Sequence, residues 1–249
     1  MSDPATSNKN PYSNKNPYKN KLLRRMSAGD FASLEPHIER CPLELRQSLE
    51  VSGSPIEAIY FLEEGIGSVV AKMPNGSDAE VGVVGLEGMT GSALIMGDDR
   101  TVHDCYVQLA GEAAKIDAEP FKAALTQSPT LRLFLLRYVQ YLHVQTGFTA
   151  LVNARSKLED RLARWLLMCD DRVDGGRLTI THEFLSIMLG VRRPGVTVAL
   201  QLLEGRGLIR SRRGEIIIRD RDGLVALADG GYGLAEAEYI RLVEHIGER

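Results

Sequence analysis

Residues 180–209 read ITHEFLSIMLGVRRPGVTVALQLLEGRGLI, and their spacing predicts two short helices separated by a tight turn. Thr181 is suited to cap the first helix, and Gly190 is suited to end it in a left-handed conformation. The second helix carries apolar residues inward at spacings of three and four, namely Val196, Ala199, Leu200 and Leu203. This order of helix, turn and helix is typical of proteins that read duplex DNA.

The second helix would present polar side chains to the DNA. Arg192 and Arg193 stand at its amino end, which is the end that enters the major groove in helix-turn-helix proteins. Arginine there can fork to guanine O6 and N7 or hold a phosphate. Pro194 is tolerated because the first turn of a helix loses no intrahelical amide bond. We expect DNA contacts from both helices and the hairpin that follows: Thr181, His182, Arg192, Arg193, Gly195, Thr197, Gln201, Arg212 and Arg213.

The residues after the second helix predict a wing. The segment 210–219, RSRRGEIIIR, offers a short strand, a turn at Gly214 and a second strand from Ile216 to Ile218. From Arg177 to Arg221 there are nine arginines against four acidic residues, although the whole chain carries a net charge of -3. A positive field concentrated in this segment suits contact with a polyanion. A helical hairpin with a solvated basic face is the alternative, and it would need the turn, the wing and the charge to coincide by accident.

Length and composition place the chain among globular proteins of two domains. No stretch approaches the roughly 20 apolar residues of a membrane span, and the first residues have no apolar core for a signal peptide, so we expect a cytoplasmic protein that does not bind membranes.

Cys41, Cys105 and Cys169 lack the paired spacings of a metal site, and we expect reduced thiols. Residues 1–21 contain the repeat SNKNPY in a polar context, which predicts a disordered tail without an assigned role.

Between residues 45 and 116 the chain alternates short strand-like segments with turn signals, which predicts a β-roll or jelly roll. The strand segments are 45–51, 58–65, 66–73, 79–85, 102–110 and 111–116. Two helices flank them, one from Ala28 to Glu39 that Pro36 interrupts and one from Glu119 to Thr126.

A long helix follows from residue 129 to about 154. It carries two apolar stripes, and each stripe needs a surface to pack against. One stripe could pack on the β-roll and the other on the same helix of a second subunit, as in a coiled coil. Burial of both stripes within one domain is the alternative. Because a DNA reader needs two half-sites, we favour a dimer. The expected dimer contacts are Phe134, Tyr138, Tyr141, Leu142, Gln145 and Phe148.

This order of parts over residues 22–225 resembles the Crp/Fnr family of bacterial transcription regulators. The segment 180–209 runs in register with the family's capped helix, glycine turn and recognition helix, and Arg193 matches a frequent base-contacting arginine. The resemblance implies an α+β fold with a cyclic-nucleotide-binding-like β-roll, and a homodimer that binds an imperfect palindrome and works with RNA polymerase. Its domains would be a tail (1–21), a β-roll sensor (22–128), a dimerisation helix (129–154) and a winged helix-turn-helix (155–249).

The chain departs from the cyclic-AMP-binding branch of that family. Pro194 and Val198 stand where that branch has a glutamate and a second arginine, so a different DNA specificity is expected. In the β-roll, Gly91-Ser92 and His103-Asp104 replace a glycine-glutamate and an arginine-serine pair. Because the cation that would hold a cyclic phosphate is missing, cyclic AMP is disfavoured unless Arg100 replaces it. The resemblance places the effector pocket at Gly91, Ser92, Arg100 and His103.

Other cofactors and functions are also disfavoured. An iron-sulfur sensor would need a cysteine cluster before residue 41, and haem would need His37, His103 or His143 as a ligand. A cupin-like metal enzyme would need converging histidines, whereas the five histidines are scattered, so we expect no metal site, no catalytic residue and no enzymatic activity. A scaffold subunit without DNA binding would not need the arginine surplus. The segment after Gly223 is expected to pack against the DNA-binding domain.

Overall fold

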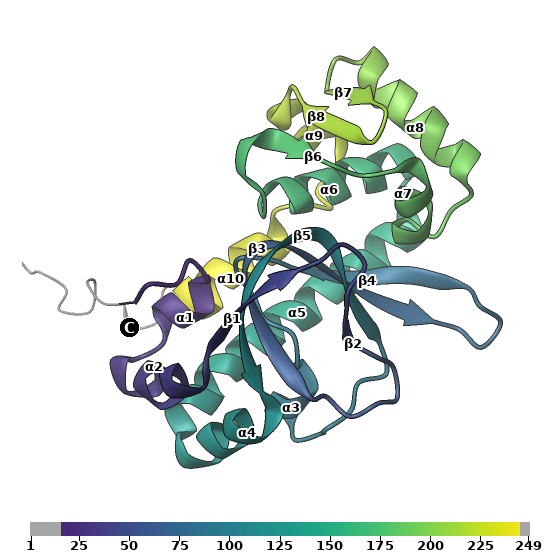
Figure 1. Ribbon diagram of the computed structural model, residues 1–249. Coiled ribbons are helices and arrows are strands. Elements are labelled where there is room, and N and C mark those ends of the chain that lie inside the picture. Colours follow the sequence, from purple (N-terminus) through teal and green to yellow (C-terminus); the bar gives the residue numbers. More distant parts are fainter. Residues whose placement is uncertain (1–15, 245–249) are drawn as a thin grey trace, which may run out of the picture.

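The computed structural model describes residues 16–244 of the chain as two packed units (Figure 1). The larger unit is a β-roll with helices against it, and the smaller one contains the helix-turn-helix. The helix α5, Pro129–Arg155, runs along the β-roll and leads to the smaller unit. The predicted mixed α and β fold is therefore confirmed.

The β-roll is built from antiparallel strands in the order β1-β5-β3-β4, and β2 pairs with β5. Its strands are β1 (Glu39–Leu43), β2 (Ser48–Glu50), β3 (Ala58–Lys72), β4 (Asp78–Val84) and β5 (Asp104–Asp117). Its helices are α1 (Lys21–Arg25), α2 (Ala28–Leu34), the 3-10 turn η1 (Glu35–His37), α3 (Ser92–Met96) and α4 (Ala118–Gln127).

Two strands of the roll are longer than the sequence predicted. The glycines that were interpreted as turns, Gly65 and Gly111, lie inside β3 and β5, where the register between these strands shifts. A β-carbon on Gly111 would lie 2.2 Å from the Glu64 carbonyl oxygen, and Gly65 has a positive φ of 89°. Glycine thus allows a bulge that bends two continuous strands together, instead of ending them.

The first described residues are folded against the roll. Asn20 is fully buried; its side-chain amide donates to the carbonyl oxygens of Leu62 and Gly88, and its backbone N–H donates to the Glu63 carboxylate. The prediction of a disordered tail is therefore wrong for residues 16–21, because a short polar side chain there satisfies buried backbone groups. The rest of that predicted tail, residues 1–15, lies outside the described residues.

The helix α5 buries the face that was expected to hold a second subunit. Tyr138 is fully buried, and its hydroxyl donates to the Met89 carbonyl oxygen at 2.8 Å. Gln145 is also fully buried and accepts a hydrogen bond from Val83 N. Phe134 and Tyr141 are buried too, and Leu142 and Phe148 are partly buried against the protomer's own core. The prediction of dimer contacts is therefore wrong for Phe134, Tyr138, Tyr141 and Gln145, because these side chains are buried within one chain, and for Leu142 and Phe148 it stays a prediction.

The smaller unit contains a three-stranded antiparallel sheet in the order β6-β8-β7 and a group of short helices. Its elements are α6 (Leu158–Asp170), η2 (Asp174–Gly176), β6 (Arg177–Leu178), α7 (His182–Met188), α8 (Arg193–Gly205), β7 (Ile209–Arg212), β8 (Glu215–Ile218) and α9 (Arg221–Leu227). Its apolar core continues into the β-roll through Ile66, Val70 and Val83, so the two units are packed together.

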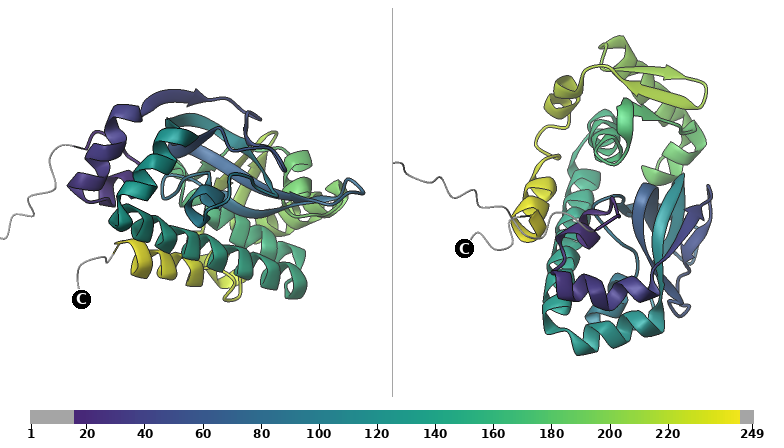
Figure 2. Two further views of the ribbon diagram at one scale, coloured as in Figure 1. Left: turned by 90° about the horizontal axis from the view of Figure 1, so that it is seen from below. Right: turned by 60° about the vertical axis from the view of Figure 1, so that its left-hand side comes forward.

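The C-terminal segment returns to the larger unit. The helix α10 (Leu234–Tyr239) and the turn η3 (Ile240–Glu244) lie beside α5, as both views in Figure 2 show. Ala235, Tyr239 and Val243 are buried in the same cluster as the residues of the β-roll. The expectation that this segment packs against the DNA-binding domain is wrong for α10, which packs on α5 and in the apolar core of the larger unit.

Among residues 16–244, no helix combines the length and the apolar character that a membrane span requires.

Candidate DNA-binding surface

The first helix of the motif, α7, begins and ends as the sequence predicted. The Thr181 hydroxyl accepts a hydrogen bond from Phe184 N at 3.2 Å, and this bond caps the helix. Gly190 has a φ of 59°, which reverses the chain after the helix. Leu185 and Met188 are buried, so α7 is fixed by its apolar face.

The second helix, α8, buries one face and exposes the other. Arg192 is its N-cap residue, and Pro194 lies in its first turn, where a missing N–H costs no helical bond. The buried face consists of Val196, Ala199, Leu200 and Leu203, as the sequence predicted. This arrangement leaves Arg192, Arg193 and Gln201 exposed.

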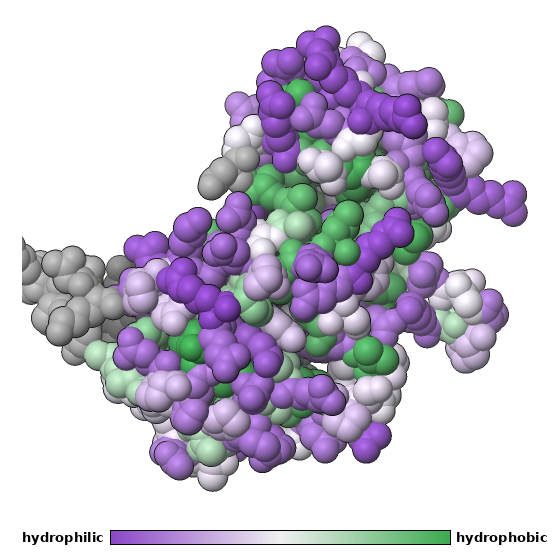
Figure 3. Space-filling view, in the orientation of Figure 1, coloured by the Kyte–Doolittle hydropathy of each residue, from purple (hydrophilic) through white to green (hydrophobic). Residues whose placement is uncertain are grey.

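The hairpin β7–β8 forms the predicted wing beside α8. Gly214 turns the chain with a φ of 74°, and the exposed Arg212 and Arg213 lie next to this turn. Within residues 16–244, ion pairs involve none of the arginines 192, 193, 210, 212 and 213. The end of the molecule over β7 and α8 is accordingly hydrophilic (Figure 3). Unpaired cations on one exposed face are available to neutralise phosphates.

Three of the predicted DNA-contacting residues, His182, Thr197 and Gly195, also contact residues within the protein. His182 Nδ1 lies 3.3 Å from Thr197 Oγ1, which joins the two helices of the motif. The Thr197 hydroxyl also donates to the Arg193 carbonyl oxygen, so its hydrogen-bonding capacity is used within the protein. A β-carbon on Gly195 would lie 3.3 Å from Leu158 Cδ2, so Gly195 faces α6 and allows close packing of α8.

A buried polar contact joins the two units, and no pattern in the sequence indicates it. Glu80 of β4 is 5% exposed; its carboxylate accepts hydrogen bonds from Trp165 Nε1 of α6, at 2.7 Å, and from the Ser68 hydroxyl. Burial raises the pKa of Glu80 to about 7, and the two hydrogen bonds oppose this rise only partly. Near it, the rings of Tyr106 and Phe184 pack edge to face across the same contact. The smaller unit therefore docks on the β-roll through a polar contact from α6 and an aromatic contact from α7.

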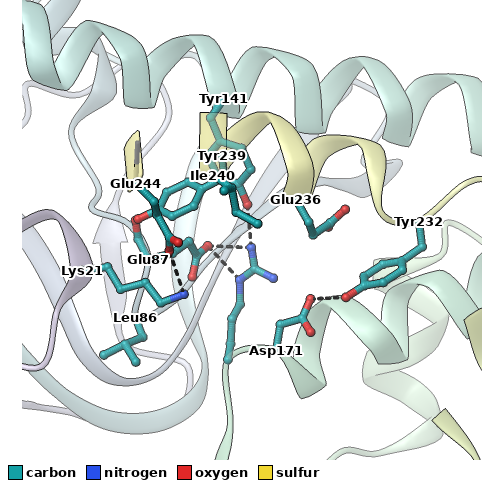
Figure 4. Close-up of a pocket in the computed structure, with 11 residues that line it drawn as sticks. Lys21, Leu86, Glu87, Tyr141, Asp171, Tyr232, Glu236, Tyr239, Ile240 and Glu244 are labelled. Atoms are coloured by element: carbon teal, nitrogen blue, oxygen red, sulfur yellow. Dashed lines mark hydrogen bonds and ion pairs between the residues drawn. The ribbon is translucent and has the colours of Figure 1, made fainter. Parts of the chain in front are cut away.

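A second polar cluster holds the junction of the β-roll, α5 and α6 (Figure 4). Arg172 follows α6, is buried, and pairs with Glu87 at 2.6 Å. Its guanidinium also donates to the Tyr141 hydroxyl at 2.9 Å, and the Tyr239 hydroxyl donates to the Glu87 carbonyl oxygen. These residues line a cavity of about 290 Å³ between the two units and the C-terminal segment.

The residues predicted for an effector pocket lie outside the largest-volume cavity described for the β-roll. The Gly91 amide donates to the Glu50 carboxylate, and Ser92 starts α3. Arg100 is exposed and contacts the Gly53 carbonyl oxygen, while His103 lies in the loop before β5. A cavity of about 450 Å³ does open in the β-roll, but other residues line it, among them Ser48, Glu50, Tyr60, Lys115 and Asp117.

Comparison with known sequences finds one family. Residues 160–227, which contain the motif and the wing, match the family model of the Crp-like helix-turn-helix domain. No curated protein matches the chain.

Solved structures of Crp/Fnr regulators have the same fold. A putative Crp/Fnr-family transcriptional regulator from Eubacterium rectale aligns with a TM-score of 0.67 at 16% identity, over 84% of this chain and 98% of its own. FixK2 from Bradyrhizobium japonicum aligns with a TM-score of 0.66 at 15% identity, over 76% and 96%. A CRP-family transcriptional regulator from Thermus thermophilus aligns with a TM-score of 0.62 at 21% identity, over 76% and 97%.

Proposed function

Because residues 160–227 form a Crp-like helix-turn-helix domain on a chain with the Crp/Fnr fold, we propose that this protein is a sequence-specific, DNA-binding transcription regulator. The observation that carries the proposal is the exposed face of α8, where Arg192 and Arg193 stand free of ion pairs within the described residues, beside the arginines of the wing. Arginine at the start of α8 would fork to guanine, and the wing would hold phosphates. RNA polymerase is the partner that such a regulator would contact.

The exposed face of α5 supports a homodimer. Seven of its exposed residues recur at alternating spacings of three and four, the heptad spacing of a coiled coil: Leu133, Leu136, Gln140, His143, Gly147, Ala150 and Ala154. We call this set the α5 seam. The small side chains at its C-terminal end would let two helices approach closely there. Two chains paired along the seam would present two recognition helices to an imperfect palindrome.

The β-roll would act as the sensor, with a ligand other than a cyclic nucleotide. The Gly91 amide donates to the Glu50 carboxylate, and the Lys72 ammonium pairs with Asp104, so the N–H donor and the cation are both engaged by carboxylates that would repel a phosphodiester. A signal in the roll would reach α8 through α5, with a coupling free energy of about 1 to 3 kcal/mol. Calorimetric titration with cyclic AMP tests this point, and no heat of binding is expected.

Selection from a pool of random DNA duplexes tests the proposed function. The purified chain is incubated with the pool at moderate salt, and the bound duplexes are sequenced. We expect enrichment of one sequence with two inverted half-sites about one helical turn apart. If salt-sensitive binding is visible but no sequence is enriched, the proposal of specific DNA recognition is wrong.

A further inference from the structure

The recognition helix α8 has an apolar edge on its exposed face. Pro194, Val198 and Leu202 recur every four residues and therefore lie on one side of the helix. Val198 is 55% exposed and Leu202 is 43% exposed, although the opposite face of the same helix is fully packed. A row of apolar residues at helical spacing thus faces outward from the element that would enter the groove.

Hydrogen-bonding side chains are scarce along this edge. The Thr197 hydroxyl donates a hydrogen bond to the Arg193 carbonyl oxygen and lies within hydrogen-bond distance of His182. The Glu204 carboxylate accepts a hydrogen bond from Ser211 N of the wing. Between Pro194 and Leu202, Gln201 is the exposed residue whose amide has no partner within the described part of the chain. Polar readout by α8 is therefore concentrated in Arg192 and Arg193 at one end and Gln201 near the other.

The chemistry of the major groove limits what an apolar edge can recognise. Each base pair presents hydrogen-bond donors and acceptors there, and thymine alone among the four bases adds an apolar C5-methyl group. An apolar side chain against a donor or acceptor would leave that group without a partner, which costs binding free energy. Against a methyl group the same side chain gains by removing apolar surface from water.

We propose that Val198 recognises the C5-methyl group of a thymine in each half-site, with Pro194 and Leu202 extending the apolar contact along the groove. This inference rests on the proposed DNA-binding function and specifies what its recognition helix reads. Val198 lies five residues after Arg193, about 7.5 Å along the helix axis at 1.5 Å per residue. Base pairs are stacked 3.4 Å apart, so the thymine would lie about two steps from the base pair held by Arg193.

The test replaces thymines of the enriched duplex by deoxyuridine, which removes the methyl group and leaves every hydrogen-bonding group in place. We expect one thymine per half-site at which deoxyuridine weakens binding about fourfold, the effect of one buried methylene-sized group. Replacing both symmetric thymines should weaken binding by about 15-fold. Affinities are measured by fluorescence anisotropy at fixed salt.

The Val198→Ala variant assigns the effect to its residue. It should bind the thymine duplex less tightly than the wild type and should lose the preference for thymine over deoxyuridine at that position. Val225→Ala is the matched control, because Val225 is an exposed valine on α9, away from α8, and should leave both affinities unchanged. A 5-methylcytosine at the sensitive position, opposite guanine, should retain more affinity than cytosine, since it restores the methyl group.

Three results would overturn the inference. Equal affinity of the wild type for every deoxyuridine duplex would show that no methyl group is read. An unchanged thymine preference in Val198→Ala would assign the methyl contact to another residue. Absence of any enriched sequence would refute the proposed function itself, and with it this inference, so the two failures are distinguishable.

Discussion

At the scale of single residues, Glu80 is a buried carboxylate with a raised pKa. It is buried between the β-roll and the helix-turn-helix unit, and its oxygens accept hydrogen bonds from Ser68 and Trp165. Burial raises its pKa from 4.5 to about 7, so the folded state binds a proton there more tightly than the unfolded state does. Protonation of this side chain therefore favours the docked arrangement of the two units.

This pKa shift predicts how stability depends on pH. The favourable contribution of the protonated carboxyl is fully present below pH 4.5, decreases as the pH rises, and is lost above pH 7. Its size is about 3 kcal/mol, from about 1.4 kcal/mol per unit of pKa. Trp165 is the single tryptophan of the chain, so its fluorescence reports this site. We expect a change of emission centred near pH 7.

The matched variant is Glu80→Gln, which keeps the shape of the side chain and cannot titrate. Its Trp165 emission should stay constant from pH 5 to pH 8, and its urea midpoint should vary less with pH than that of the wild type. A wild-type midpoint that rises between pH 5 and pH 8 relative to Glu80→Gln would contradict the assignment.

Residue-level patterns predicted the helix-turn-helix well, because its determinants are local. Thr181, Gly190 and the apolar spacing of α8 act within a few residues of one another. The contacts of His182 with Thr197 and of Gly195 with Leu158 could not be predicted from the sequence, because only the packing of α8 on its neighbours brings these residues together. The apolar edge at Val198 could have been predicted from spacing, since position 198 falls outside the buried face.

At the scale of elements, the strands and the long helix show where sequence patterns are ambiguous. Gly65 and Gly111 were predicted to end strands, yet they form bulges because β3 and β5 continue through them in pairing. On α5, both stripes are apolar enough to be buried, and periodicity does not tell which faces the β-roll. The structure packs Tyr138 and Gln145 of one stripe and Leu135 of the other within the same chain, and the α5 seam lies on a further face that belongs to neither stripe.

The α5 seam leads to a prediction about assembly. Ala150→Glu would place two like charges close together across the paired helices, in a position that coiled coils keep apolar. We expect the dimer dissociation constant to rise at least about tenfold, with a parallel loss of affinity for the palindromic duplex. Sedimentation equilibrium measures the first quantity.

Ala123→Glu is the control, because Ala123 is an exposed alanine on α4 and lies outside the seam. This variant should dimerise like the wild type. Equal dissociation constants for Ala150→Glu and the wild type would show that the seam is not the dimer contact.

At the scale of the whole molecule, the C-terminal segment connects the two units a second time. Arg164 of α6 donates a hydrogen bond to the Gly231 carbonyl oxygen, and Tyr232 donates to Asp171. Further along, Tyr239 packs edge to face on Tyr141 of α5. The sequence indicated two helical pieces separated by glycines, but the surface that α10 covers is formed by α5, which lies far earlier in the chain, so local patterns do not reveal it.

Tyr239 and its neighbour Ile240 test whether this segment belongs to the cooperative fold. Tyr239 is buried, and Tyr239→Ala should lower the free energy of unfolding by about 3 to 5 kcal/mol through loss of a large packed side chain. Ile240 is 41% exposed, and Ile240→Ala should change the free energy of unfolding by less than about 0.5 kcal/mol. Urea denaturation measures both. Equal midpoints for the two variants would show that the segment does not contribute to the stability of the core.

The ability of α8 to distinguish one DNA sequence from others is the claim on which the whole account depends. The most direct measurement compares the affinity of the chain for the enriched duplex with its affinity for a scrambled duplex of the same composition, at one salt concentration. We predict a ratio of at least about 1,000 for the wild type. Arg193→Ala should lower this ratio by about 5- to 150-fold, since one guanine contact is lost. Equal affinities of the wild type for both duplexes would contradict the account.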